Sequence, residues 1–173
     1  MYQRILVPVD GSPTSSAGLD EAIALAKLTG ARLRLVHVVD EMPFVMSAEG
    51  YGAMSSDVLG LLKEAGEKIL AASRQRVEAK GVAVDAVLFD SLSGRLSDRV
   101  ADQTKEWKAD LVVLGTHGRR GVQRMLLGSD AEQIVRSAPV PVLLVRSADA
   151  PPDAPHEWTG RVTSPLKGLL ASA

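Results

Sequence analysis

Cysteine is absent from the 173-residue sequence. Disulfide bonds, thiol catalysis and cysteine-based zinc or iron–sulfur sites are therefore excluded. The sequence also lacks an excess of charge of either sign, because it has 20 lysines and arginines and 21 aspartates and glutamates, a formal net charge of -1. This balance gives no general attraction to nucleic acid or to an anionic membrane surface, so we expect neither as a partner. Any anion site must be local.

Long hydrophobic runs are missing as well. Nowhere do roughly 18 apolar residues follow one another, the length that a membrane-spanning helix needs. The N-terminal run Ile5 to Val9 is interrupted by Pro8 and stopped by Asp10, which makes it too short for the core of a signal peptide. These features predict a cytoplasmic protein without a membrane anchor.

Several motifs of catalysis and nucleotide binding do not occur. The chain has neither the Walker pattern GxxxxGK[ST] nor the dinucleotide fingerprint GxGxxG, which weighs against ordinary P-loop NTPases and Rossmann dehydrogenases. The GxSxG nucleophile elbow and the HExxH zinc motif are absent too. We therefore predict no catalytic triad and no metal held by protein ligands.

What is present is an alternation of strand and helix patterns in a chain of globular composition, with 46% hydrophobic and 24% charged residues. One run, Val82 to Phe89, has a weak strand pattern. Four others have the composition of fully buried strands: Arg4 to Val9, Arg32 to Val39, Asp110 to Leu114 and Val140 to Val145.

Helical patterns separate these runs. Ser12 is a helix cap with Pro13 at the first helical position, and Gly30 ends a helix whose body is Thr14 to Thr29. A later helix is indicated by an apolar stripe at Val58, Leu62, Ala65, Ile69 and Ala72, and its spacing is repeated by Leu92, Leu96 and Val100.

The alternation predicts an α/β fold, a doubly wound three-layer sandwich with a five-stranded parallel sheet, because right-handed crossovers place helices on both faces. Ligands bind such sheets beyond the carboxyl ends of the strands, at the switch point where the winding direction reverses. We expect this domain to span residues 1–146 and to be followed by a Pro- and Ala-rich C-terminal tail over residues 147–173.

Two segments have more than one interpretation. The connection Asp40 to Ser56 is too apolar for a free linker and too irregular for a helix. It is a lid, a partner-contact loop, or a surface loop folded onto its own domain. The tail is either disordered or docks on the body or on another subunit. The side chains that would dock it are Trp158, Leu166, Leu169 and Leu170.

The clearest candidate site is a glycine-rich loop after the fourth strand. Gly115, Gly118 and Gly128 stand where the strand opens into the loop and where the loop enters a helix. Glycine lets backbone amides approach a bulky anion, and the helix start offers unpaired N–H groups and the positive end of its dipole. The loop is a plausible phosphate cradle. Its local positive charge comes from Arg119, Arg120 and Arg124.

The start of the following helix also has a purely structural interpretation. Ser129 and Glu132 fit a capping box, in which Ser129 bonds the Glu132 amide and Glu132 reaches back, so that the serine needs no ligand. Asp130 suits the helix dipole but would repel a bound phosphate. Spacing alone leaves both interpretations open.

Three further residues are candidates of different strength. Asp10 ends the first strand at the expected switch point, where it either meets a ligand or only forms a turn. His37 alternates with apolar neighbours in a strand, which favours a buried, hydrogen-bonded histidine over a ligand or catalyst. His117 lies in the glycine loop and is the better ligand candidate.

The spacing Gly115-x2-Gly118-x9-Gly128-Ser129 resembles the nucleotide-binding pattern of the universal stress protein family. The opening ILVPVDGS from Ile5, the strand VHVV from Val36 and the closing APVPVLLV from Ala138 are similar to the family too. The resemblance covers about residues 1–146. It implies an adenine-nucleotide-binding α/β sandwich with strand order 3-2-1-4-5, usually dimeric through the last strand.

In the family, members with the full glycine pattern tend to bind ATP, so the resemblance implies ATP, or ADP or AMP, as the ligand and a place for each part of it. Adenine is expected near Val9, Asp10 and Val38, and ribose near Pro8 and Gly115. Phosphates are expected at the glycine loop and the helix start, with Mg²⁺ bridging them rather than held by protein ligands. The residues concerned there are His117, Gly118, Arg119, Gly128, Ser129, Asp130 and Ala131. Asp130 departs from the apolar residue commonest at this position, which bears on triphosphate affinity and on the need for Mg²⁺.

Three functions are compatible with these features. The first is a homodimeric stress protein that senses or sequesters ATP with at most slow hydrolysis. The second is a scaffold of the same fold that acts through protein contacts of residues 40–56 and the tail, its glycine loop being structural. The third is an adenine-nucleotide hydrolase using His117 or Asp10, which is disfavoured because no pair of base and nucleophile is apparent.

Overall fold

The computed structural model describes residues 1–39, 56–90, 95–116 and 128–146. Its centre is a parallel five-stranded sheet in the order β3-β2-β1-β4-β5. The predicted fold class and strand order are confirmed. Of the loop predicted over residues 40–56, residues 40–55 lie outside the described residues, as does the tail over 147–173, and Ser56 is the first residue of a helix. In chain order the strands are β1 (Arg4–Pro8), β2 (Arg32–Val39), β3 (Val84–Asp90), β4 (Leu111–Gly115) and β5 (Val142–Val145).

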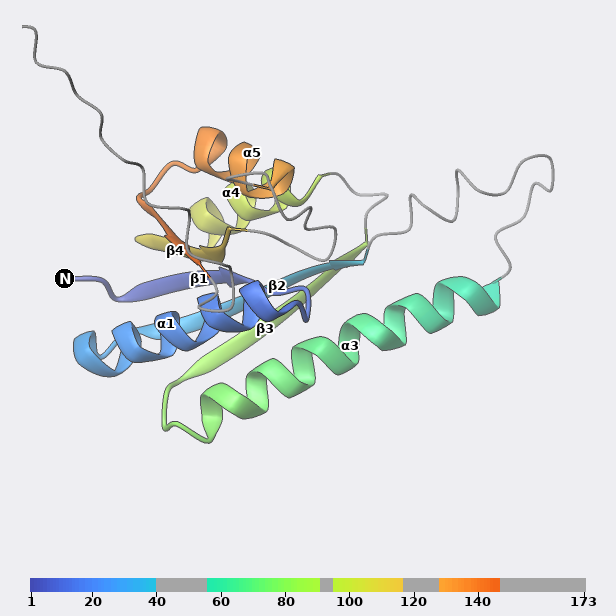
Figure 1. Cartoon of the computed structure of the whole chain (residues 1–173), viewed down its shortest axis with the longest axis horizontal. Coiled ribbons are helices and arrows are strands. Elements are labelled where there is room, and N and C mark those ends of the chain that lie inside the picture. Colours follow the sequence, from blue (N-terminus) through green and yellow to red (C-terminus); the bar gives the residue numbers. More distant parts are fainter. Residues whose placement is uncertain (40–55, 91–94, 117–127, 147–173) are drawn as a thin grey trace, which may run out of the picture.

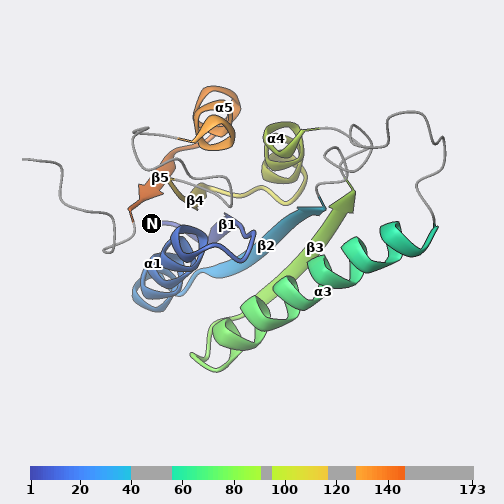
Figure 2. The same cartoon turned by 45° about the vertical axis from the view of Figure 1, so that its right-hand side comes forward.

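Helices cover both faces of the sheet, α1 and α3 on one and α4 and α5 on the other (Figure 1, Figure 2). Side chains alternate along each strand, so neighbouring residues feed different cores. Ile5 and Val7 pack under α1 and α3, whereas Leu6 packs under α4 and α5. Within the described ranges, no helix is long and apolar enough to cross a membrane. The helices are α1 (Pro13–Thr29), α3 (Ser56–Glu78), α4 (Leu96–Glu106) and α5 (Ser129–Ser137).

The first helix begins and ends as its sequence predicts. The Ser12 hydroxyl accepts a hydrogen bond from the Ser15 amide at 3.1 Å, and Pro13 is the first helical residue. Gly30 adopts the left-handed conformation, with φ 72°, and donates its amide to the Ala26 carbonyl at 2.8 Å. These are the cap and stop signals that proline, serine and glycine supply at helix ends.

The N-terminal half of α1 lies against the backbone at the end of β4. A Cβ atom on Gly18 would stand 3.0 Å from the Gly115 amide nitrogen. A Cβ atom on Gly115 would collide with the Thr14 carbonyl oxygen and stand 2.9 Å from the Ser15 nitrogen. Helix and strand therefore approach each other here because both positions lack a side chain.

The predicted stripe of α3 is only partly correct. Ala65 and Ala72 are exposed, and the residues that face the sheet are Gly66, Leu70 and Val77. A Cβ atom on Gly66 would lie 2.9 Å from Cδ2 of His37, so the helix approaches β2 more closely than any larger residue would allow. The side of α3 that faces the sheet is thus set by side-chain size as well as hydrophobicity.

The two edge strands differ from the central ones. Val140 to Val145 has the composition of a fully buried strand, but β5 is an edge strand whose side chains are partly exposed, with Leu144 at 37%. Buried strands and partly exposed edge strands can share an apolar composition, so the sequence did not distinguish them. The predicted helix residue Leu92 lies outside the described ranges, while Val100 of that pattern is buried.

At the opposite edge, β3 is tied to β2 by a charged pair. The Arg34 guanidinium donates to both carboxylate oxygens of Asp85, at 2.7 and 3.0 Å, and lies over the Trp107 ring at 4.9 Å. The hydrogen bond that Arg34 donates to Asp85 is the main cause that raises the pKa of Arg34, and desolvation by burial opposes it. This pairing explains how a strand predicted to be buried carries an arginine at its centre.

We expect Gly115→Ala to lower the free energy of unfolding by roughly 1–3 kcal/mol, the usual cost of forcing an extra group into a packed site. The physical reason is the collision of the new methyl group with the backbone of Thr14 and Ser15. Urea denaturation measures the change. Gly60→Ala is the matched control, because no atom lies within 4 Å of a Cβ placed there. Equal stability of the two variants would contradict the close approach of α1 and β4.

Candidate functional site

The carboxyl ends of β1 and β4 form the switch point that the fold predicts. The chain leaves β1 for α1 on one face of the sheet, and after β4 it returns as α5 on the other face (Figure 2). The two strands are neighbours in the sheet, with Ile5 opposite Leu111. The connections diverge at this edge, which is where ligands bind in such sheets.

Asp10 closes the turn that leads from β1 into α1. One carboxylate oxygen accepts a hydrogen bond from the Ser12 amide at 2.9 Å, and the Asp10 amide donates to the Ser15 hydroxyl at 3.1 Å. Gly11 between them has φ 78°. The turn role considered for Asp10 is therefore present, and it fixes this carboxylate at the switch point.

His37 is buried, as its strand pattern favours. It is 5% exposed, and its Nδ1 lies 2.6 Å from the Val9 carbonyl oxygen. Because a carbonyl only accepts, Nδ1 carries the proton and donates. This bond links β2 to the residue after β1 and orients the peptide of Val9.

The residues expected near adenine come from both faces of the sheet edge. Val9 belongs to the core under α1 and α3, and its amide donates to the Val36 carbonyl at 2.9 Å. Val36 belongs to the other core, and alternation along β2 puts Val38 on that same side. Val9 and Val38 thus share the strand-end edge but send their side chains in opposite directions.

The start of α5 differs from the capping box. The N-cap is Gly128, with φ -67° and ψ 150°, and Ser129 is the first helical residue and exposed. The first helix bond runs from the Glu132 amide to the Gly128 carbonyl at 2.9 Å. Glu132 does not reach back, because its carboxylate accepts from Arg136 at 2.7 Å. The capping-box interpretation of Ser129 is wrong.

One hydrogen bond anchors this helix start to the sheet. The Gly128 amide donates to the Thr116 carbonyl at 2.8 Å, and the Thr116 amide donates to Val145 at 3.0 Å. The amides of Ser129, Asp130 and Ala131 come before the first helix bond, so no carbonyl of the helix accepts from them. They form the positive end of the α5 dipole beside the end of β4.

The glycine loop after β4 holds part of the predicted site. His117, Gly118 and Arg119, together with Arg120 and Arg124, lie in 117–127, outside the described residues. Among the residues that are described, no three histidine, aspartate or glutamate side chains gather as a metal site. The described members of the predicted site are brought to one end of the sheet: Pro8, Val9, Asp10, Val38, Gly115, Gly128, Ser129, Asp130 and Ala131.

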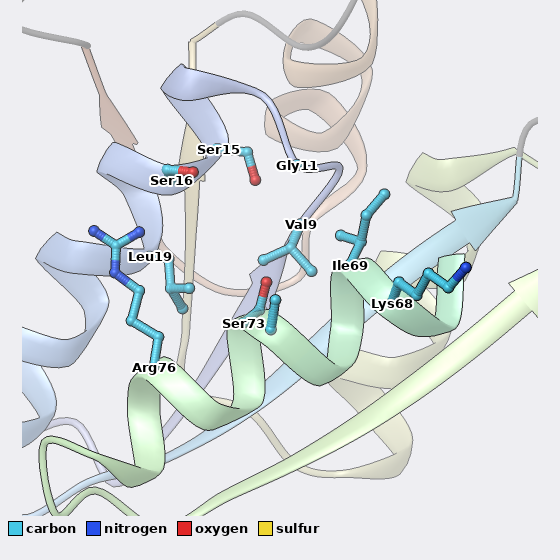
Figure 3. A pocket seen from close by; sticks show the side chains of 10 residues that line it. Val9, Gly11, Ser15, Ser16, Leu19, Lys68, Ile69, Ser73 and Arg76 are labelled. Carbon is cyan, nitrogen blue, oxygen red and sulfur yellow. The ribbon is translucent and has the colours of Figure 1, made fainter. Parts of the chain in front are cut away.

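Sequence reasoning missed a groove of about 420 Å³ between α1 and α3 (Figure 3). Of the residues predicted to bind the nucleotide, it contains only Val9. Small residues on both helices leave it open, among them Ala72 of the predicted apolar stripe. The sequence did not indicate this exposure, because the apolar stripe predicted that Ala72 faces the sheet.

Comparison with known proteins gives a consistent result. Residues 1–146 match the Universal stress protein family. A universal stress protein of Methanocaldococcus jannaschii is 37% identical over 147 residues, which cover 84% of this chain and 83% of that protein. Among solved structures, universal stress protein UspA from Lactobacillus plantarum is similar with a TM-score of 0.70 and 29% identity, over 84% of this chain and 98% of that one.

Two further similar structures contain nucleotides. A universal stress protein in complex with cAMP has a TM-score of 0.60 and 24% identity, covering 85% of this chain and 98% of that one. The universal stress protein from Archaeoglobus fulgidus in complex with dAMP has a TM-score of 0.60 and 21% identity, covering 83% and 98%. At these identities the likeness concerns the fold.

Proposed function

Because the chain belongs to the universal stress protein family, we propose that it binds an adenine nucleotide, ATP foremost, and acts in the cytoplasm as a sensor or regulator of the stress response. The binding site is the switch point between β1 and β4. Two proteins of the same fold bind cAMP and dAMP, which are adenine nucleotides, and they support this choice of ligand.

The observation that carries the proposal is the anchored start of α5. Its first-turn amides have no acceptor in the helix, and the bond from Gly128 to Thr116 holds them at the end of β4. Aligned N–H groups at a helix start favour a phosphate. Gly128 already donates its own amide to Thr116, so its part in the site is to keep this approach free of a side chain. The phosphates lie against Gly128, Ser129, Asp130 and Ala131.

The base and sugar take the neighbouring strand ends. Adenine lies at Val9, Asp10 and Val38, and ribose at Pro8 and Gly115. Since the side chains of Val9 and Val38 point to opposite faces, the base meets mainly the main chain at the edge. Gly115 turns its Cβ position toward α1, so it too offers only main chain to a ligand.

The loop after β4 supplies the remaining phosphate contacts in this proposal. Gly118 lets the loop come close to the phosphates, while His117 and Arg119 add a donor and a positive charge. These contacts are assigned by the family pattern, because the loop lies outside the described residues.

Asp130 determines how the triphosphate is neutralised. Its exposed carboxylate stands in the first turn of α5, where it repels phosphate but attracts a divalent cation. Mg²⁺ carried by the phosphates would offset the negative charge of Asp130. Slow hydrolysis fits the hydrogen bonds of the two nearest candidate bases. Asp10 accepts from the Ser12 amide and His37 donates to the Val9 carbonyl, so both side chains are engaged within the protein.

The proposal also includes a homodimer formed through β5. This strand ends the sheet, pairing only with β4 among the described strands, and its outer edge leaves backbone donors and acceptors for another strand. Leu144 on β5 and Val135 on α5 are exposed at 37% and 43%. Burial of these apolar side chains would stabilise a second copy seated there.

We expect Gly128→Val to lower ATP affinity at least tenfold, about 1.4 kcal/mol of binding free energy. A side chain at the helix start hinders the approach of phosphate, while φ -67° and ψ 150° suit any residue and keep the helix intact. Isothermal titration calorimetry gives the affinity and thermal unfolding confirms folding. Gly60→Ala serves as the control. Undiminished affinity in a folded Gly128→Val variant would reject the site.

When Mg²⁺ is removed with EDTA, the Asp130→Asn variant should bind ATP about fivefold more tightly than the wild-type chain does, because one negative charge near the phosphates is lost. The same change should lower stability by about 0.3–1 kcal/mol, since the helix start loses a favourable carboxylate. Binding and unfolding thus move in opposite directions. Glu21→Gln, an exposed carboxylate on α1, is the control and should change neither. Weaker ATP binding by Asp130→Asn without Mg²⁺ would contradict this role.

For the dimer, Leu144→Glu should give monomers where the wild-type chain is dimeric, because a charge would be buried in the interface. Light scattering after gel filtration reports the mass. Leu28→Glu changes an 80% exposed leucine on α1 and should leave the dimer intact. A monomeric wild-type chain, or a dimeric Leu144→Glu variant, would refute assembly through β5.

A further inference from the structure

The groove between α1 and α3 borders the proposed nucleotide site at Val9. It opens on the α1 and α3 side of the sheet, whereas α5 and its first-turn amides lie on the other side (Figure 2). Val9 is the one residue that the groove shares with the proposed nucleotide site, and its carbonyl accepts the hydrogen bond from His37. None of the phosphate-binding positions described above lines the groove.

Apolar side chains and serine hydroxyls line the groove together. Val9, which follows β1, Leu19 of α1 and Ile69 of α3 supply apolar surface, with serine hydroxyls among them (Figure 3). Ala72 of α3 lines it as well. A volume of about 420 Å³ lies within the range of small-molecule sites, which combine a mostly apolar lining with a few polar groups. The groove therefore has the size and lining of a site for a small amphipathic molecule.

Two cations lie at opposite ends of the groove (Figure 3). Lys68 and Arg76 are eight residues apart on α3, about 12 Å along a helix axis at 1.5 Å per residue. Arg76 bonds Asp20 of α1 at 2.5 Å, so its charge is balanced. Lys68 forms no ion pair within the described part of the chain, and no acidic residue lines the groove.

We propose that this groove binds an amphipathic monoanion, such as a medium-chain carboxylate. The carboxylate head pairs with Lys68, and the apolar body lies along Ile69, Val9 and Leu19 toward the bridge between Arg76 and Asp20. Lys68, the one lining cation without an ion pair among the described residues, selects one negative charge, and the apolar side chains of the lining select an alkyl or aromatic body over a polar one. This proposal goes beyond the nucleotide function and does not depend on it.

The test is calorimetric titration of the full chain with decanoate below its micellar concentration, with 8-anilinonaphthalene-1-sulfonate fluorescence as a second probe. Ala72→Phe fills the groove from an exposed position and should reduce affinity at least tenfold. Ala71→Phe places the same ring at an exposed position that does not line the groove and should leave affinity unchanged. Lys68→Gln should weaken binding about fivefold, and Lys63→Gln should not.

Decanoate binding that survives Ala72→Phe, or no binding by the folded wild-type chain, would overturn the proposal. Equal losses in Ala71→Phe and Ala72→Phe would do so too, because they would indicate unspecific adsorption. Gly128→Val should bind decanoate like the wild type, which separates the two sites. Displacement of decanoate by ATP at equal stoichiometry would show one site instead of two and would also overturn the inference.

Discussion

The close approach of α1 to the end of β4 is the constraint on which the rest of the site depends. Gly18 and Gly115 have no side chains at the point of contact, so the helix rests on the strand backbone. The first turn of α1, with its Ser12 cap and its Asp10 turn, is thereby placed beside the last residue of β4. On the other face, the bond from Gly128 to Thr116 places the start of α5 at the same strand. The two helix starts border one short stretch of sheet edge.

Much of the fold could be predicted from hydrophobic runs and helix punctuation, because both are local. β1, β2 and α1 lie where their sequences place them, since buried strands need apolar residues and helix ends need specific caps. The exposed side of α3 could not be predicted, and the edge position of β5 followed from the family resemblance but not from the composition of the strand. Gly66 faces the sheet because α3 touches His37, and β5 is exposed because nothing described pairs with its outer side. Both depend on neighbours distant in sequence.

The same limit applies to the site. The glycine spacing predicted a phosphate site in the loop after β4, but it gave Gly115 and Gly128 the same task. In the structure Gly115 serves the packing of α1, and Gly128 is a helix N-cap bound to Thr116. Ser129 was a plausible cap by spacing, yet the helix begins one residue earlier because Gly128 is anchored to the strand. The pairing of Arg34 with Asp85 and the groove beside α3 likewise arise only when separate elements come together.

The central claim is that the first-turn amides of α5 and the ends of β1 and β2 hold an adenine nucleotide. Titrating ¹⁵N-labelled protein with ATP and Mg²⁺ while following the amide resonances by NMR tests it most directly. The account predicts that the largest shifts fall on Ser129, Asp130 and Ala131, with a second group at Val9, Asp10 and Val38. Shifts confined to the groove between α1 and α3, or no shifts at saturating ATP, would contradict it.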